Sequence, residues 1–262
     1  MDWMSTINLT CTIISLITIM QCIIVAIKKA TKYFGDLIHL DRALQFSKSN
    51  CCISLSVFKK DIIGSSHDYV TFYSAKSYQE LSVLLRKRNI SIEPMSDIYN
   101  ENNKIYIGGP SANVEVNSIL TRFEAFKYYT EPYQKETYEK NKVNQHFIIY
   151  SEEKKGYMFG NKFFDIDKKS KDIGIFIRIP ENKKKGILYT THIIFAAWDI
   201  GTYKAVEFFV NNYKIISKKF KDNPYCFVIS ISRIDNSPRI ISVNEIQDVS
   251  QEFFGGTDII VK

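Results

Sequence analysis

The sequence lacks the short motifs that mark many enzyme classes. It contains no GxSxG nucleophile turn, no phosphate-binding GKS or GKT and no CxxC pair, and its 4 histidines form no HExxH pairing. These absences exclude the serine hydrolases, P-loop nucleotidases, dithiol oxidoreductases and zinc proteases that depend on those motifs. We therefore assign no catalytic residue, expect no metal or cofactor, and favour a binding protein over an enzyme.

Cysteine is scarce and irregularly spaced. The count of 5 is odd, and the spacing fits neither a disulfide framework nor a zinc site. Two of the cysteines, Cys11 and Cys22, fall in an apolar N-terminal run. These features predict reduced thiols and a cytoplasmic location for the part of the chain that follows this run.

Charge is missing from one stretch near the N-terminus. No charged residue occurs from Trp3 to Ile27, and a helix needs about 20 predominantly apolar residues to cross a bilayer. A secretory signal has a basic start and a cleavage site, whereas Asp2 precedes this run and Lys28 follows it. Because cytoplasmic flanks are rich in Lys and Arg, residues 3–27 are predicted to span the cell inner membrane once, with the C-terminal domain in the cytoplasm.

Polar residues within this run fall on one face of the predicted helix. They recur at alternating spacings of three and four residues, opposite a lipid-like face. Small and polar groups let membrane helices approach and hydrogen-bond, which predicts self-association. A channel lined by this stripe is a further hypothesis that goes beyond the periodicity. The alternative is that each hydroxyl bonds a carbonyl of its own helix and needs no partner. The predicted pore-lining residues are Asn8, Ser15, Thr18 and Cys22.

The rest of the chain has the composition of a folded domain. Aromatic residues make up 14% and hydrophobic residues 45% of the sequence, which excludes a disordered tail. Residues 28–48 are predicted to form a juxtamembrane helix or linker, and residues 49–262 a single α/β domain.

The chain carries a formal net charge of +7, and the excess gathers in short lysine-rich clusters. Such clusters commonly form a solvated surface, but they also suit a phosphate-bearing ligand or an anionic lipid. The candidate basic patch is Lys183, Lys184 and Lys185.

Short apolar runs alternate with segments of helical periodicity. Strands are predicted at 51–58, 105–107, 175–179, 192–197 and 225–231, with helices at 116–123 and 205–220 between them. Ser77 and Glu80 form a capping box that predicts a helix ending near Asn89. Residues 146–166 are predicted to form a hairpin around Glu152 to Gly156. This alternation favours an α/β fold with a largely parallel sheet.

Two segments combine a strand, a glycine turn and a helix. In such sheets ligands bind beyond the carboxyl ends of the strands, where helix N-termini attract anions. The two turns are therefore predicted to flank one nucleotide-like ligand, although ordinary connections that use glycine to avoid a clash would have the same pattern. The predicted ligand-binding residues are Gly108, Gly109, Pro110, Asn113, Gly201, Thr202 and Lys204.

An enzyme remains the second hypothesis. Pockets of α/β sheets of this kind host nucleotide hydrolases without short signatures, so the chain could instead be a membrane-tethered enzyme that hydrolyses or depletes a nucleotide. The first catalytic suspects would be Asn113, Asp199 and Glu207.

Several segments together resemble a known family. They are VTFYSAKSYQELSVLLRKRNI, the GGPxxN turn, KDIGIFIRIP and IIFAAWDIGTYKAVEFFV, within residues 50–245. They resemble SLOG-type, Rossmann-like nucleotide-sensing domains, and with the N-terminal span the chain is similar to the membrane effectors of the antiphage system Hailong. The resemblance implies a homotetrameric ion channel held shut by single-stranded DNA oligomers, with the basic clusters as candidate DNA contacts. The residues that match the motif are Gly108, Gly109, Pro110, Asn113, Gly201 and Thr202.

Overall fold

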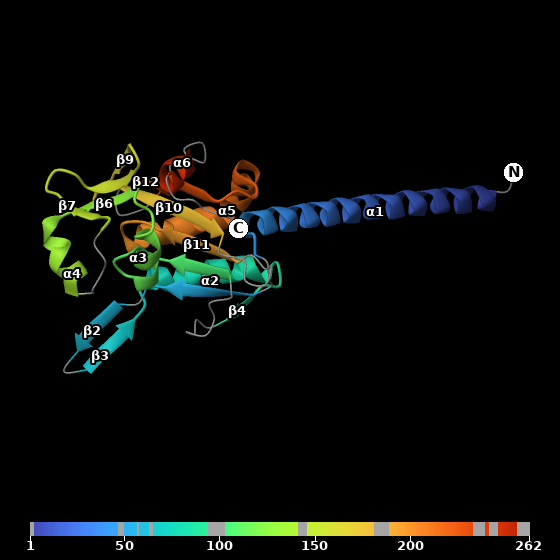
Figure 1. Cartoon of the computed structure of the whole chain (residues 1–262). Coiled ribbons are helices and arrows are strands. Elements are labelled where there is room, and N and C mark those ends of the chain that lie inside the picture. Colours follow the sequence, from blue (N-terminus) through green and yellow to red (C-terminus); the bar gives the residue numbers. More distant parts are fainter. Residues whose placement is uncertain are drawn as a thin grey trace.

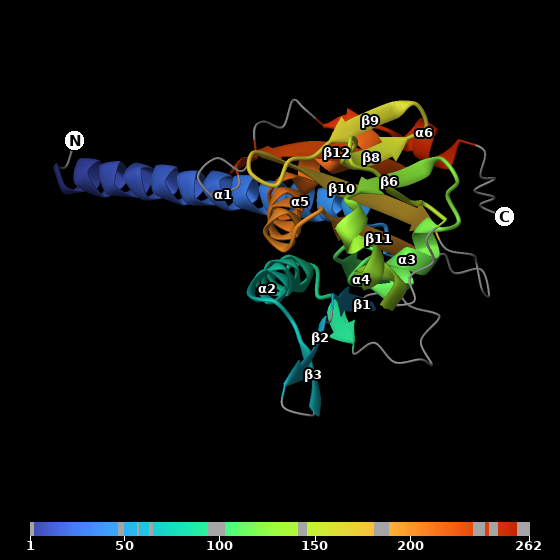
Figure 2. The ribbon, with the colours of Figure 1, turned by 90° about the vertical axis from the view of Figure 1, so that its left-hand side faces the viewer.

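The protein consists of one long helix and a globular body (Figure 1). The computed structural model describes residues 3–46, 50–56, 58–62, 65–93, 103–140, 146–180, 189–232, 239–240 and 246–255. Helix α1 (Trp3–Leu44) projects from the body, which is built around an eight-stranded sheet. Helices cover one face of this sheet, and a smaller sheet lies over the other (Figure 2). The predicted α/β class is therefore confirmed.

Helix α1 continues without a break across the predicted boundary between residues 27 and 28. It ends at Leu44, and Gln45 turns the chain with a φ of 51°. From Ser15 to Phe34 its side chains are exposed, and large apolar ones lie among them. Within the described residues, no helix is both long and apolar enough to cross a membrane. The side chains of residues 3–14, which belong to the predicted span, lie outside the described part.

The central sheet is mixed, with a parallel half. Four neighbouring strands, β4, β1, β5 and β11, run parallel, whereas β10 runs antiparallel to both β11 and β12. The strand order is β13-β12-β10-β11-β5-β1-β4, with β14 also paired to β12. The strands are β1 (Asn50–Leu55), β4 (Ser91–Glu93), β5 (Asn103–Ile107), β10 (Lys171–Pro180), β11 (Thr190–Phe195), β12 (Tyr225–Ser232), β13 (Arg239–Ile240) and β14 (Gln247–Asp248).

One face of the sheet is covered by α2 (Phe72–Arg86), α5 (Asp199–Phe220) and the last turns of α1. Alternate strand residues such as Ile107 and Phe176 pack beneath them in one buried core. This layer fixes which faces of α2 and α5 are buried, because the apolar stripe of each helix must lie on the sheet.

The other face carries α3, α6 and a four-stranded sheet of order β7-β6-β8-β9. A hairpin, β2 (Phe58–Ile62) with β3 (Ser65–Tyr69), extends from the body on its own (Figure 1). The remaining elements are α3 (Val114–Leu120), β6 (Phe126–Thr130), η1 (Pro132–Gln134), α4 (Lys135–Lys140), β7 (Ile148–Tyr150), β8 (Gly156–Phe159), β9 (Lys162–Asp165) and α6 (Ser250–Phe254).

The predicted start of α2 is wrong. The helix begins five residues earlier than Ser77, and Thr71 is its N-cap, because its hydroxyl accepts a hydrogen bond from the Ser74 amide at 3.1 Å. Ser77 lies inside the helix, where its hydroxyl donates to the carbonyl of Tyr73 at 2.8 Å. A serine with a glutamate three residues on is thus not sufficient to place a cap.

The predicted hairpin of residues 146–166 is also wrong. Strand β7 pairs in parallel with β6 and not with β8. The hairpin is formed by β8 and β9, and it turns at Gly160, whose φ of 55° suits a tight turn. The sequence placed the turn too early because Gly156 is also typical of a turn, whereas the structure uses it as the first residue of β8.

Candidate functional site

The two predicted glycine turns lie side by side at one edge of the central sheet. The strands that precede them, β5 and β11, are parallel neighbours, so their carboxyl ends meet. The amide of Gly108 donates to the carbonyl of Ile194 at 3.0 Å. A Cβ at Gly109 would lie 3.4 Å from the ring of Phe195. The structure therefore brings both segments to one crevice.

In the first turn, the predicted residues hold the local structure. Gly108 has a φ of 113°, and a Cβ there would lie 1.7 Å from the Ser56 hydroxyl oxygen, so only glycine fits. Asn113 is the N-cap of α3 and accepts from the amide of Val116 at 3.2 Å. Its side-chain amide donates to the hydroxyl of Ser54 at 3.1 Å. Pro110 is buried between them in the chain.

In the second turn, a carboxylate of the protein already binds the amides that an anion would use. Asp172, fully buried on β10, accepts from Ala197 N at 3.1 Å and from Trp198 N at 3.3 Å. Gly201 allows this approach, because a Cβ there would lie 1.9 Å from Asp172 Oδ2. Thr202 Oγ1 accepts a hydrogen bond from the backbone amide of Ala196. A ligand anion therefore needs another partner.

The charged side chains near these turns are held by one another. Lys204 Nζ lies 2.7 Å from Glu207 Oε2. Asp199 Oδ1 accepts from the hydroxyl of Ser74 at 3.0 Å, which joins the N-termini of α5 and α2. Among the described residues, the three catalytic suspects are not gathered around one cavity: Asn113 caps a helix, and Asp199 and Glu207 bind their neighbours.

A cavity of about 370 Å³ opens where both turns face the small sheet. Its size lies in the range of small-molecule sites. Ser111 reaches it from the first turn, and Ala197 and Trp198 reach it from the second. The rest of its lining comes from the small sheet, η1, α4 and the loop before β10: Tyr128, Tyr129, Thr130, Glu131, Tyr133, Gln134, Tyr138, Lys155, Ile166, Asp167 and Lys168.

Four tyrosines form the aromatic wall of this cavity. Tyr128 stacks on Tyr157 with ring centroids 4.7 Å apart, and burial raises the pKa of Tyr128 and of Tyr138. Both phenols therefore stay protonated at neutral pH and can donate hydrogen bonds. Tyr133 stands at the rim with 68% of its surface exposed.

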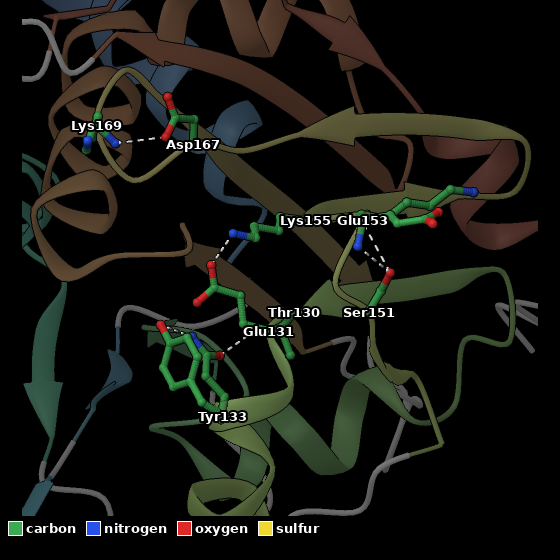
Figure 3. A network of polar contacts seen from close by, with 10 residues as sticks. Thr130, Glu131, Tyr133, Ser151, Glu153, Lys155, Asp167 and Lys169 are labelled. Carbon is green, nitrogen blue, oxygen red and sulfur yellow. Dashed lines mark hydrogen bonds and ion pairs between the residues drawn. The ribbon is translucent and has the colours of Figure 1, made fainter.

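The charged part of the cavity is an ion pair between Lys155 and Glu131 (Figure 3). The Glu131 carboxylate raises the pKa of Lys155, so the ammonium is charged at neutral pH. Asp167 lies nearby, and its carboxylate accepts from the hydroxyl of Ser170 and the amide of Lys169. These bonds lower the pKa of Asp167. The cavity thus presents two cations, Lys155 and Lys168, and two carboxylates, Glu131 and Asp167.

The small sheet, which forms one wall of the site, was not predicted from the sequence. The signal that could have found it is the segment AFKYYTEPYQ, in which three tyrosines and a lysine fall within ten residues. Aromatic and basic residues at this density are typical of surfaces that bind nucleic acids and nucleotides.

The other predicted sites are placed only in part. Ser15, Thr18 and Cys22 lie on the exposed stretch of α1, and the side chain of Asn8 falls outside the described residues. The basic patch at 183–185 also falls outside them. In the described part of the chain, no group of three His, Cys, Asp or Glu side chains could hold a metal ion.

Comparison with protein-family models, curated proteins and solved structures found no match for this chain.

Proposed function

We propose that this protein is a membrane-anchored sensor of nucleotides, an antiphage effector whose oligomer forms a channel. A nucleotide or a single-stranded DNA oligomer bound to the cytoplasmic domain would gate it. The observation that carries the proposal is the cavity at which both glycine turns meet four tyrosines and Lys155. The antiphage role and the tetramer rest on the resemblance to membrane effectors alone.

The cavity lining suits the parts of a nucleotide. Aromatic faces stack on bases, with about 1–3 kcal/mol for each base. Lys155 and Lys168 can bind phosphate, and Ser111, Thr130 and Gln134 supply hydrogen-bonding groups for a sugar or base edge. A volume of about 370 Å³ admits one nucleotide unit, so a longer oligomer would insert a single residue.

The cavity is connected to α1 through the central sheet. Trp198 follows β11, and His192 on that strand bonds the carbonyl of Leu44 at 2.8 Å. On the neighbouring strand, Arg178 donates to the carbonyls of Arg42 and Ala43 at 2.8 and 3.1 Å. A ligand that shifts β11 would move the end of α1. It gates the protein only if it binds the two states with different affinity.

In the proposed assembly, residues 3–27 span the inner membrane and the polar stripe lines the pore. The run without charge from Trp3 to Ile27 and the lysines after it support this placement. The body, residues 49–262, would then lie in the cytoplasm.

The alternative function is a membrane-tethered enzyme that consumes a nucleotide. Glu131 and Asp167 line the same cavity, and a pair of carboxylates can act as general acid and base. Glu131 is paired with Lys155, and Asp167 accepts a hydrogen bond from Ser170 in its own turn. Because both carboxylates already have partners, we favour the sensor over the enzyme.

The test is to purify the full-length protein in mild detergent, measure its mass by light scattering and extract bound nucleotide. A defined oligomer that carries nucleotide supports the sensor, and a ligand-free monomer contradicts it. In cells, depolarisation that is lost in a Ser15→Leu, Thr18→Leu variant supports the channel. Nucleotide depletion without depolarisation supports the enzyme.

A further inference from the structure

The cation best placed for a ligand phosphate in this cavity is already paired within the protein. Lys155, from the loop before β8, points at the carboxylate of Glu131 at the end of β6 (Figure 3). Both side chains are partly open to solvent, with 45% and 31% of their surfaces exposed. Exposed pairs of this kind contribute little to stability, so a ligand can exchange with one partner at low cost.

Glu131 is held at this place by its charge. It precedes η1, but its side chain makes no capping hydrogen bond to that helix, whose first residue is Pro132. Asp167, the other carboxylate of the cavity, bonds Lys169 N at 3.1 Å and Ser170 Oγ at 2.5 Å. Glu131 is therefore the carboxylate that a ligand can displace without breaking a turn.

The usual alternative for phosphate, the amides after β11, is closed to a ligand. Asp172 accepts from Ala197 N and Trp198 N beneath the first turn of α5. A phosphate in the cavity must then find its positive partner among the lysines of the lining, Lys155 and Lys168, and Lys155 already binds a carboxylate there.

We propose that Glu131 is an internal counter-ion that a ligand phosphate replaces on Lys155, and that the cavity selects a phosphate monoester over a phosphodiester. This inference rests on the proposed function and specifies its ligand. A monoester carries nearly two negative charges at neutral pH, whereas a diester carries one. If a diester replaces the carboxylate, the negative charge beside Lys155 stays the same. If a monoester replaces it, the negative charge beside Lys155 increases and the attraction is stronger.

The exchange would also carry a signal. Glu131 joins β6 to η1 and α4, the elements that place Tyr133 and Tyr138 at the cavity. Once released from Lys155, the carboxylate is repelled by the bound phosphate, so the wall of the site responds to occupancy.

The test measures binding of a nucleoside, its 5′-monophosphate and the methyl ester of that monophosphate to the full-length protein by calorimetry. The monophosphate should bind about threefold more tightly than the methyl ester, because one exposed ion pair contributes at most about fivefold to an affinity. Glu131→Gln should strengthen binding of the monophosphate and leave the nucleoside unchanged. Lys155→Met should remove the preference for the monophosphate.

Asp165→Asn is the matched control. It removes the same charge from the small sheet at an ion pair with Lys171 that does not line the cavity. It should leave all three affinities unchanged. Equal binding of monophosphate and methyl ester, or no effect of Glu131→Gln, would overturn the counter-ion role and leave the nucleotide site standing. Failure of all three compounds to bind would overturn both proposals.

Discussion

Asp172 and Arg178 lie on the same face of β10, six residues apart, and each is buried under one end of α5. The carboxylate accepts from the amides of Ala197 and Trp198 at the start of the helix. The guanidinium donates to the carbonyls of Lys221 and Asn223 after its end. An anion at the N-terminus and a cation at the C-terminus both favour the helix dipole, so one strand holds α5 at its two ends.

The first prediction concerns the close approach at the start of α5. Gly201→Ala should destabilise the domain by about 3 kcal/mol or more, because its Cβ would overlap Asp172 Oδ2 and force apart a packed, charged contact. The measurement is thermal unfolding of the full-length variant. Gly35→Ala is the control, since nothing lies within 4 Å of its Cβ position and alanine is the better helix former. Equal melting temperatures for the two variants would contradict this account.

The second prediction concerns the hydrogen bonds that hold the C-terminal end of α1. Arg178→Met should cost about 3 kcal/mol or more, because it leaves several buried carbonyls without a donor. Hydrogen exchange should rise at the amides before Gln45 more than in the rest of the body. Arg178→Lys, with a single ammonium in place of the planar fork, should give an intermediate loss.

Arg86→Met tests whether the loss is particular to this buried arginine. Arg86 is exposed in the last turn of α2, so the substitution should leave unfolding and exchange within about 0.5 kcal/mol of the parent. A loss as large as that of Arg178→Met would show that charge alone matters.

The third prediction is a pH dependence. Burial lowers the pKa of His192 from 6.5 to about 3, and the neighbouring Arg178 charge acts in the same direction. The folded state therefore keeps this imidazole neutral, while the unfolded chain takes up a proton below pH 6.5. Stability from this group is complete above pH 6.5 and declines as the pH falls toward 3, by about 2 kcal/mol at pH 5.

His192→Gln should abolish that part of the acid sensitivity. The comparison is the free energy of unfolding in urea at pH 7.5 and pH 5, where the parent should lose about 2 kcal/mol more than the variant. His146→Gln, at an exposed position, should lose as much stability between pH 7.5 and pH 5 as the parent does. Parallel slopes for parent and His192→Gln would contradict a neutral buried imidazole.

The fourth prediction concerns the aromatic wall. Tyr133→Ala should weaken binding of a nucleoside monophosphate by about tenfold, since base stacking contributes about 1–3 kcal/mol. Because the side chain is 68% exposed, stability should change little. Tyr33→Ala, at a position 56% exposed on α1, should leave binding as it is. Calorimetry on both variants makes the comparison, and equal affinities would remove Tyr133 from the site.

The sequence predicted the α/β class and the two glycine turns at strand ends because both follow from local patterns. That the two turns meet depends on the pairing of β5 with β11, which is a matter of strand order, and the sheet is parallel only from β4 to β11. Apolar runs that end in glycine mark strand ends, and parallel neighbours bring those ends together. It also named Asn113 as a ligand-binding residue and a catalytic suspect, whereas the structure makes this residue the N-cap of α3.

The role of Asp172 could not be predicted in this way. Its partners, Ala197 and Trp198, are about 25 residues away and reach it only through the antiparallel pairing of β10 with β11. The same holds for the small sheet, whose parallel pair β6 and β7 has no local signature. Contacts made across strands of unknown order are set by tertiary packing, which periodicity does not report.

Because α1 is unbroken, the number of residues in it determines the direction in which its far side chains face relative to the body. Successive residues turn by about 100° and rise 1.5 Å, so 42 residues form a rod of about 63 Å. The carbonyls of Arg42 and Ala43 fix the azimuth of this rod at the body, and thereby the direction in which Ser15 and Thr18 face. Deletion of one residue between Thr18 and Arg42 would rotate the polar stripe by about 100° relative to the body. Deletion of seven residues would return the stripe almost to its original direction. The number of residues in the exposed stretch is thus part of how the body and the stripe are aligned.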